Sequence, residues 1–132
     1  EFLEFVSMQT NRSTLGGLLL NNVCEVKFLR RRQKPGQPAT RRMLCTKSSN
    51  LLNSVNGRVV LNYRPPTHPT RINESKDNAL VVWDIFVQNF RVVSMENCEL
   101  IRQFPADESF WEYFNENILP MNEAQKIAFM DS

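Results

Sequence analysis

Cations crowd one short stretch of this 132-residue chain. Between Lys27 and Lys47 the sequence holds eight basic residues and no acidic one. Seven of them lie in or beside a single connection: Lys27, Arg30, Arg31, Arg32, Lys34, Arg41 and Arg42. Guanidinium and ammonium groups on one loop can follow the phosphates of a nucleic acid. These seven residues are our candidate nucleic-acid-binding set.

The same stretch lacks flanking aromatic residues of the kind on which single-stranded bases stack. Nucleic-acid binding through it would therefore be mainly electrostatic, with a weak preference for sequence. The structural alternative is a solvated, charged loop that keeps the neighbouring strand edges from pairing with other chains.

A second candidate surface is acidic and aromatic. Residues 96–132 carry eight acidic side chains against two basic ones, so the charge asymmetry along the chain indicates either a nucleic-acid face at one end or packing of the two ends on each other. Four aromatic residues lie close together there: Phe110, Trp111, Tyr113 and Phe114. One exposed helix does not accommodate so many, so some are buried against the chain's own sheet or against another protein. The candidate protein-binding residues are Trp111, Glu112, Tyr113 and Glu116.

Enzyme motifs are absent from the sequence. It has no glycine-rich phosphate loop, no G-x-S-x-G turn and no H-E-x-x-H motif. The single histidine, His68, lies beside a proline in what we interpret as a solvated loop. Cys24, Cys45 and Cys98 lack the spacing of a zinc site and are odd in number, so we interpret them as small buried hydrophobes. We predict a non-enzymatic protein without catalytic residues, metal or cofactor.

Length and composition indicate one small globular domain. The chain is 42% hydrophobic and 23% charged, which is ordinary for a soluble protein. No apolar run approaches the roughly 20 residues of a membrane span, so we expect a cytoplasmic protein. The first seven residues, EFLEFVS, precede the first methionine and are left out of the fold prediction, because a cloning vector or a longer chain could supply them.

The elements that position the candidate residues are mainly strands. Alternation of apolar and polar side chains predicts strands over residues 23–29, 41–46 and 99–104. Prolines and a glycine interrupt the stretch between the first two, so residues 30–42 form the basic loop of a hairpin. The predicted inward residues include Met43, Cys45 and Leu100.

Residues 79–95 predict the central hairpin, in which two strand-like runs meet across a very short turn. A two-residue turn at its centre places Asp84 opposite Arg91, as a cross-strand ion pair on one face. Trp83 and Phe90 then lie on the other, core-facing side. Because the turn lacks an Asn-Gly or Asp-Gly pair, a loop one or two residues longer is the alternative.

The segment between the second strand and the hairpin is less regular. Ser48 or Ser49 is placed to cap one helical turn. The Asn-Gly pair at residues 56 and 57 predicts a turn followed by a short strand over 59–63. Residues 64–78 predict a long loop.

Helices are predicted at both ends of the chain. Ser13 or Thr14 caps a short one over residues 15–20. Asp107 caps another that runs through residue 117, and a second helical stretch begins near Asn122.

Three stretches carry a resemblance to a known family. They are residues 20–28 (LNNVCEVKF), residues 41–46 (RRMLCT) and Val81–Asp84 answered by Phe90-Arg91. Read together, they resemble the Sm-like, SH3-type small β-barrel proteins encoded by T4-like and other tailed bacteriophages. The resemblance covers residues 19–104. The family usually has Trp where this chain has Phe90, and a shorter connection where this chain has residues 55–78.

The resemblance implies a mainly β (α+β) fold, a small antiparallel SH3/Sm-like β-barrel. We expect an N-terminal tail over residues 1–12, the barrel domain over 13–104 with basic loop 30–42 and long loop 64–78, and a helical C-terminal extension over 105–132. Sm-type barrels tend to form rings by pairing through their strand edges, so the edges could support an oligomer. The alternative is that the long basic and proline-rich loops of this chain block those edges.

A phage origin implies a role in the host cell cytoplasm, such as host takeover. The function we expect is that of a non-enzymatic, phage-encoded binding protein that contacts a host or phage protein, for example by modulating a nucleic-acid enzyme or a host defence protein. The alternative is a nucleic-acid-binding accessory factor that uses the basic loop on phosphate backbones, since Sm-like barrels often bind RNA. No membrane partner is expected.

Overall fold

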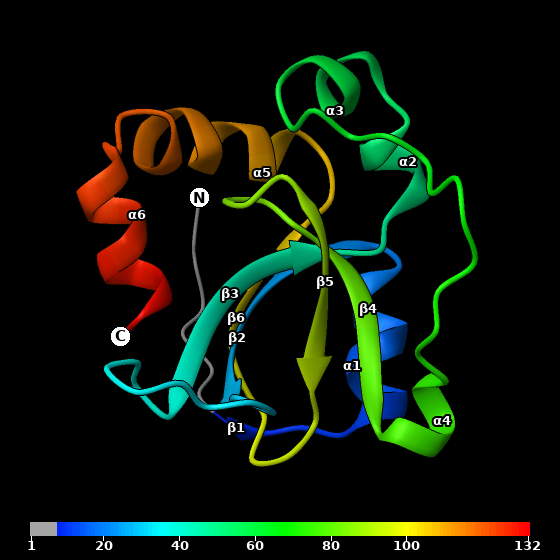
Figure 1. Ribbon diagram of the computed structural model, residues 1–132. Coiled ribbons are helices and arrows are strands. Elements are labelled where there is room, and N and C mark those ends of the chain that lie inside the picture. Colours follow the sequence, from blue (N-terminus) through cyan, green and yellow to red (C-terminus); the bar gives the residue numbers. More distant parts are fainter. Residues whose placement is uncertain (1–7) are drawn as a thin grey trace.

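One antiparallel sheet organises the protein, and the computed structural model describes it within residues 8–132 (Figure 1). Its strands are β1 (Met8–Gln9), β2 (Asn22–Leu29), β3 (Thr40–Thr46), β4 (Ala79–Asp84), β5 (Asn89–Ser94) and β6 (Glu99–Pro105). Their spatial order is β1-β6-β2-β3-β4-β5. The predicted strands over 23–29, 41–46 and 99–104 and the α+β class are thus confirmed. The segment EFLEFVS lies outside the described residues.

The sheet is open. Strands β1 and β5 form its two edges and do not pair with each other, whereas a barrel requires every strand to have two hydrogen-bonded neighbours. The sheet of the predicted small antiparallel β-barrel is therefore present but not closed into a barrel. Residues assigned to an N-terminal tail also contribute to the sheet, because Met8 and Gln9 pair with Leu100 and Glu99.

Helices surround this sheet. They are α1 (Arg12–Leu19), α2 (Ser49–Leu52), α3 (Val55–Val59), α4 (Glu74–Asp77), α5 (Glu108–Tyr113), the π-helix η1 (Phe114–Ile118) and α6 (Glu123–Met130). The predicted caps Ser48 and Asp107 and the predicted helix start near Asn122 are confirmed. The predicted cap at Ser13 or Thr14 is wrong, because α1 is capped by Asn11. None of the helices in the described part of the chain is long and apolar enough to cross a membrane.

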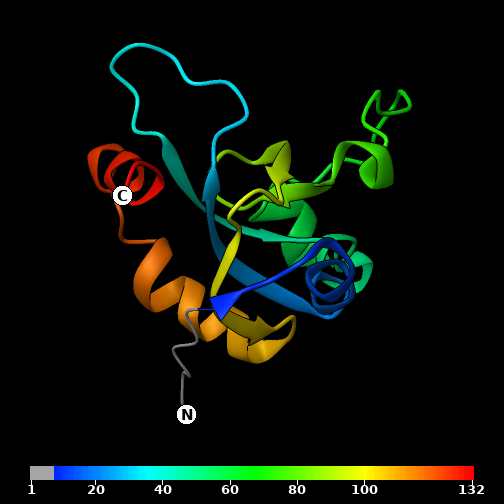
Figure 2. The same ribbon diagram turned by 90° about the horizontal axis from the view of Figure 1, so that it is seen from below.

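Each face of the sheet buries its own hydrophobic core. On one face, α1 inserts Leu15 and Leu19 among side chains of all the longer strands, namely Cys24, Val26, Phe28, Met43, Cys45, Leu80, Val82, Val93 and Leu100. The predicted inward residues Met43, Cys45 and Leu100 all belong to this core. The other face is covered by α2, α5 and η1, whose core includes Val23, Leu44, Trp83, Phe104, Phe110, Phe114 and Ile118. Because both faces are apolar, helices flank the sheet on both sides (Figure 1 and Figure 2).

The predicted turn at residues 56 and 57 and the strand over 59–63 are wrong. The chain instead forms α3, because the Ser54 side chain accepts a hydrogen bond from Gly57 N (3.0 Å) and caps a helical turn. Gly57 is buried against the backbone of α2, where a Cβ would lie 2.5 Å from Leu52 O. The glycine serves a close helix approach that local turn statistics do not reveal. The long loop also contains the short helix α4.

The register of the central hairpin differs from the two-residue turn that we predicted. Asp84 lies opposite Asn89, and Arg91 lies opposite Val82. Residues 85–88 form the connection, in which Gln88 has a φ of 59°. The longer loop that the weak turn signal left open is the one observed. Trp83 and Phe90 face each other edge to face, with ring centroids 5.0 Å apart.

The close approach at Gly57 predicts a strong effect of adding one methyl group. Gly57→Ala should lower the free energy of unfolding by about 2 kcal/mol, because backbone atoms of α2 cannot yield easily. Gly17→Ala is the matched control: Gly17 is exposed within α1 with nothing near its Cβ position, and the change should raise stability by up to about 1 kcal/mol. Urea unfolding followed by tryptophan fluorescence measures both. Equal effects would show that the packing at Gly57 is looser than described.

Candidate nucleic-acid interface

The connection between β2 and β3 stands out from the sheet as a loop (Figure 2). Arg30 N donates to Ala39 O (2.8 Å) and closes its base, and Gln37 N donates to Lys34 O (3.0 Å) across a turn. Gly36 permits this turn through a φ of 82°. Residues 31–39 are all exposed. The loop therefore presents its cations to solvent on an ordered base.

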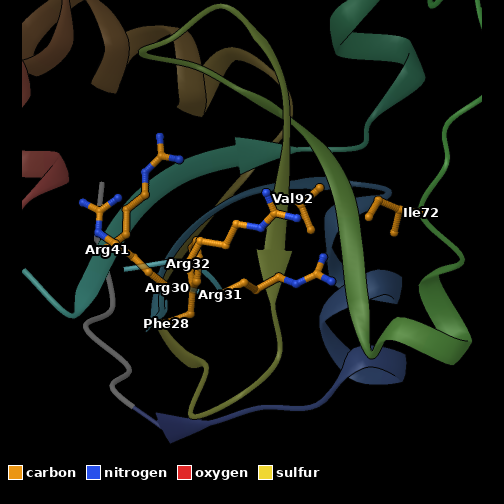
Figure 3. A pocket seen from close by; sticks show the side chains of 7 residues that line it. All are labelled: Phe28, Arg30, Arg31, Arg32, Arg41, Ile72 and Val92. Carbon is orange, nitrogen blue, oxygen red and sulfur yellow. The ribbon is translucent and has the colours of Figure 1, made fainter. Parts of the chain in front are cut away.

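A hollow of about 410 Å³ lies at the base of this loop. It is lined by Phe28, Arg30, Arg31, Arg32, Arg41, Ile72 and Val92, and we call it the basic groove. Figure 3 shows that Arg31 and Arg32 extend toward Val92 of β5, whereas Arg30 and Arg41 lie on the other side, near β3. No acidic residue lines the groove. Four guanidinium groups around one hollow make it a candidate site for an anion, with Arg30 and Arg41 already paired with Asp131 and Asp84.

The seven predicted cations do not share one environment. Arg31, Arg32 and Lys34 are exposed. Lys27 is half-buried within β2, and Lys27 and Lys34 do not line the groove. The remaining three, Arg30, Arg41 and Arg42, form ion pairs with carboxylates. The structure thus brings four of the seven around the groove and leaves three outside its lining.

A second hollow, which shares Arg31 with the basic groove, is lined by acidic residues. It has a volume of about 420 Å³ and is lined by Arg31 together with Asp77, Asn78, Ser94 and Glu96. These carboxylates offset part of the positive potential around Arg31. Arg32, which does not border that hollow, is the cation whose charge is least compensated among the lining residues.

Arg41 supports the fold as well as the groove. Its Nη2 donates to Asp84 Oδ2 at 2.5 Å, and Asp84 is buried, with a side chain 1% exposed. Asp84 Oδ1 also accepts from Phe86 N (2.9 Å) and Val87 N (3.0 Å), which shapes the hairpin turn. Burial raises the pKa of Asp84, while the Val87 amide and Arg41 oppose that rise. The predicted ion pair between Asp84 and Arg91 is wrong, because the carboxylate points to β3.

Arg42 lies on the opposite face of β3 from Arg41. Its Nη1 lies 3.4 Å from Oε2 of Glu25, whose side chain is fully buried, and Arg102 Nε lies 2.7 Å from Glu25 Oε1. Burial raises the pKa of Glu25, and the two arginines oppose this. The Arg42 guanidinium also lies 5.4 Å from the centre of the Phe129 ring. Arg42 is therefore a structural cation that neutralises a buried carboxylate.

The predicted protein-binding residues are divided by burial. Glu112 and Glu116 are exposed, whereas Trp111 and Tyr113 are half-buried. The Tyr113 ring packs 4.2 Å from that of Phe104, and burial raises its pKa. Both aromatic residues thus pack against their own chain. Part of Trp111 still borders a hollow of about 230 Å³ between α2 and α5.

The cysteines are buried thiols, as predicted. All three are free, and burial raises the pKa of Cys24 and of Cys98 to about 12. Such thiols are protonated at neutral pH and unreactive. Among the described residues, no group of three His, Cys, Asp or Glu side chains could hold a metal ion.

Sequence reasoning missed the apolar wall of the groove. Phe28, Ile72 and Val92 come from β2, the long loop and β5, which are far apart in the chain. The alternation of apolar and polar side chains predicts the strands that carry Phe28 and Val92, but it does not predict that these residues line one hollow. The strand order puts β3 and β4 between β2 and β5, so only the curvature of the sheet brings Phe28 and Val92 to the same hollow.

Comparison with known proteins yields no relative: no family model, no curated protein and no solved structure matches the chain. Fold and site together define a small α+β protein with an open antiparallel sheet and an arginine-lined groove. The resemblance to Sm-like phage proteins stays a prediction.

The ion pair of Asp84 with Arg41 predicts how substitutions of Asp84 and Arg91 change stability. Asp84→Ala should lower the free energy of unfolding by about 3 kcal/mol, because it leaves Arg41 without its carboxylate and the turn amides without an acceptor. Arg91→Ala should cost less than about 1 kcal/mol. Urea unfolding at neutral pH measures both variants. A larger loss for Arg91→Ala would support the cross-strand pair instead.

Proposed function

We propose that this protein is a non-enzymatic binding protein that contacts the phosphate backbone of a nucleic acid through its basic loop and groove. The observation that carries the proposal is the set of four arginines around a hollow without an acidic lining residue. The aromatic residues of α5, by contrast, are largely occupied by packing within the chain. This favours the basic loop over α5 as the principal contact.

The chemistry of the groove suits a backbone ligand. Exposed Arg31, Arg32 and Lys34 supply charges that lose their counterions when phosphates bind. The apolar wall formed by Ile72 and Val92 offers van der Waals contact to sugars. Phe28, the aromatic residue in the lining, is only 4% exposed and offers no platform for a base. We therefore expect the binding affinity to fall steeply as salt is raised and to vary little with nucleic-acid sequence.

We also propose that the open sheet is a divergent, unclosed relative of the SH3/Sm-like fold, of phage origin and acting in the host cell cytoplasm. Support comes from the sequence resemblance and from strand β2, which pairs with both β3 and β6. Further support comes from α1, which precedes β2 and contributes to the core on one face of the sheet. In such a protein the exposed edge of β5 could serve an oligomer.

The proposal predicts how binding changes when two groove cations are removed. The double variant Arg31→Ala/Arg32→Ala should weaken binding to a labelled DNA or RNA strand at least tenfold at low salt and reduce the slope of log Kd against log salt by about two. Fluorescence anisotropy at several NaCl concentrations measures both quantities.

The matched control is Arg58→Ala/Arg64→Ala, which removes the same charge from exposed positions outside the groove. It should change affinity only slightly. Wild-type binding that is absent, or insensitive to salt, would refute the proposed function. Equal losses in both double variants would show that net charge, not the groove, governs binding.

A second candidate function is contact with a host or phage protein. The hollow beside Trp111 is rimmed by Asp107 and Glu108, and Glu112 and Glu116 extend the acidic surface along the helices. A half-exposed tryptophan with an acidic rim is suited to a basic partner surface. Such a partner could be a nucleic-acid enzyme or a host defence protein, and it would be compatible with nucleic-acid contact elsewhere.

Charge reversal tests this second function without disturbing the core. Glu112→Lys/Glu116→Lys should abolish recovery of a specific partner from bacterial lysate, because both carboxylates are exposed, and should leave the unfolding midpoint nearly unchanged. Affinity capture with quantitative mass spectrometry provides the measurement, with Glu123→Lys on α6 as the control. Partner profiles that are identical for all three proteins would contradict it.

A further inference from the structure

The end of α6 covers three arginines of the candidate nucleic-acid-binding set. Three residues in sequence each contact a different one: the Phe129 ring lies 5.4 Å from the Arg42 guanidinium, Met130 Sδ 3.8 Å from Arg41 Nη2, and Asp131 Oδ1 2.9 Å from Arg30 Nη2. Both views place this end of α6 beside the basic loop. A segment at the end of the described chain thus meets the base of a loop that is far from it in sequence.

Of these contacts, the ion pair of Asp131 with Arg30 neutralises a cation that lines the basic groove. Arg30 donates through Nε to Pro38 O (3.0 Å) and through Nη2 to Asp131, and its side chain is 14% exposed. A carboxylate on this guanidinium takes the position that a ligand phosphate would take. Arg41 and Arg42 differ, because each also holds a buried carboxylate and keeps that role whether or not α6 is present.

The attachment of α6 is suited to reversible release. None of its residues is buried, and Ile127 is 52% exposed. Asp131 is 42% exposed, and ion pairs exposed to that extent contribute little to stability. A capping box formed by Asn122 and Gln125 holds the first turn of the helix through contacts within α6 itself. Release would expose the half-buried Phe129 ring, which packs edge to face on Phe86 with centroids 4.7 Å apart, but no fully buried side chain of α6.

We propose that α6 is an autoinhibitory latch, in which Asp131 competes with ligand phosphates for Arg30. The inference rests on the proposed function and concerns the regulation of the same groove. When a polyanion binds, the Asp131 carboxylate leaves Arg30 and α6 loosens from the sheet. The latch thereby lowers affinity for phosphate ligands, DNA included, because the Asp131–Arg30 pair must break before Arg30 can contact a phosphate.

The decisive experiment compares two isosteric variants of the full chain. Asp131→Asn removes the latch carboxylate, and Glu123→Gln removes the same charge from the start of α6, where its side chain is 87% exposed. Fluorescence anisotropy with a labelled DNA duplex should show an affinity gain several-fold larger for Asp131→Asn than for Glu123→Gln. The salt dependence of log Kd should steepen by about one unit for Asp131→Asn alone, because one more cation becomes free for a phosphate.

The outcomes separate the latch from the function on which it rests. Salt-dependent binding by the wild type with equal effects of the two substitutions would overturn the latch and leave the proposed function standing. Absence of binding by all three proteins would overturn both. Hydrogen exchange gives an independent readout: amides of α6 in the wild type should exchange faster when DNA is bound, and unchanged protection would also overturn the latch.

Discussion

The ion pair between Asp84 and Arg41 is the interaction on which much of this structure depends. Strands β3 and β4 share only two paired positions, Cys45 with Asp84 and Thr46 with Trp83. A carboxylate buried at the end of this short ladder must be neutralised and hydrogen-bonded, because an unpaired charge there would cost several kcal/mol. Arg41 and the two turn amides satisfy it. The pair therefore joins the β4–β5 hairpin to the rest of the sheet and fixes the shape of its turn.

The same pair links the fold to the basic groove. Arg41 is held on β3 by Asp84, and its guanidinium forms one wall of the groove. On the other face of β3, Arg42 neutralises Glu25 in the same manner. Cations at the strand end are thus fixed by buried carboxylates, whereas Arg31, Arg32 and Lys34 in the loop are exposed. A polyanion would contact both the fixed cations of β3 and the exposed cations of the loop. Only the loop side chains would then lose conformational entropy on binding.

Local patterns in the sequence predict the parts of the fold that depend on local interactions. Alternating side chains give strands β2, β3 and β6, and cap residues such as Asp107 and Asn122 give the starts of helices. The errors arise where a partner is distant in sequence. The Asn-Gly pair at residues 56 and 57 is typical of a hairpin turn, but Gly57 is required by the close backbone of α2. A two-residue turn would place Arg91 opposite Asp84, whereas its actual partner, Arg41, lies on β3. The groove combines three separate segments, so its cations were predictable and its apolar wall was not.

The charge asymmetry of the chain had two interpretations, a nucleic-acid face or packing of the basic and acidic ends on each other. The structure contains a small element of the second: of the acidic residues beyond Glu96, Asp131 pairs with the basic loop at Arg30, while Glu112 and Glu116 remain exposed elsewhere. One exposed carboxylate cannot neutralise a loop that also presents Arg31, Arg32 and Lys34. Most of the positive charge of the loop is therefore left for another anion. Such an anion must also displace Asp131 if it is to contact Arg30.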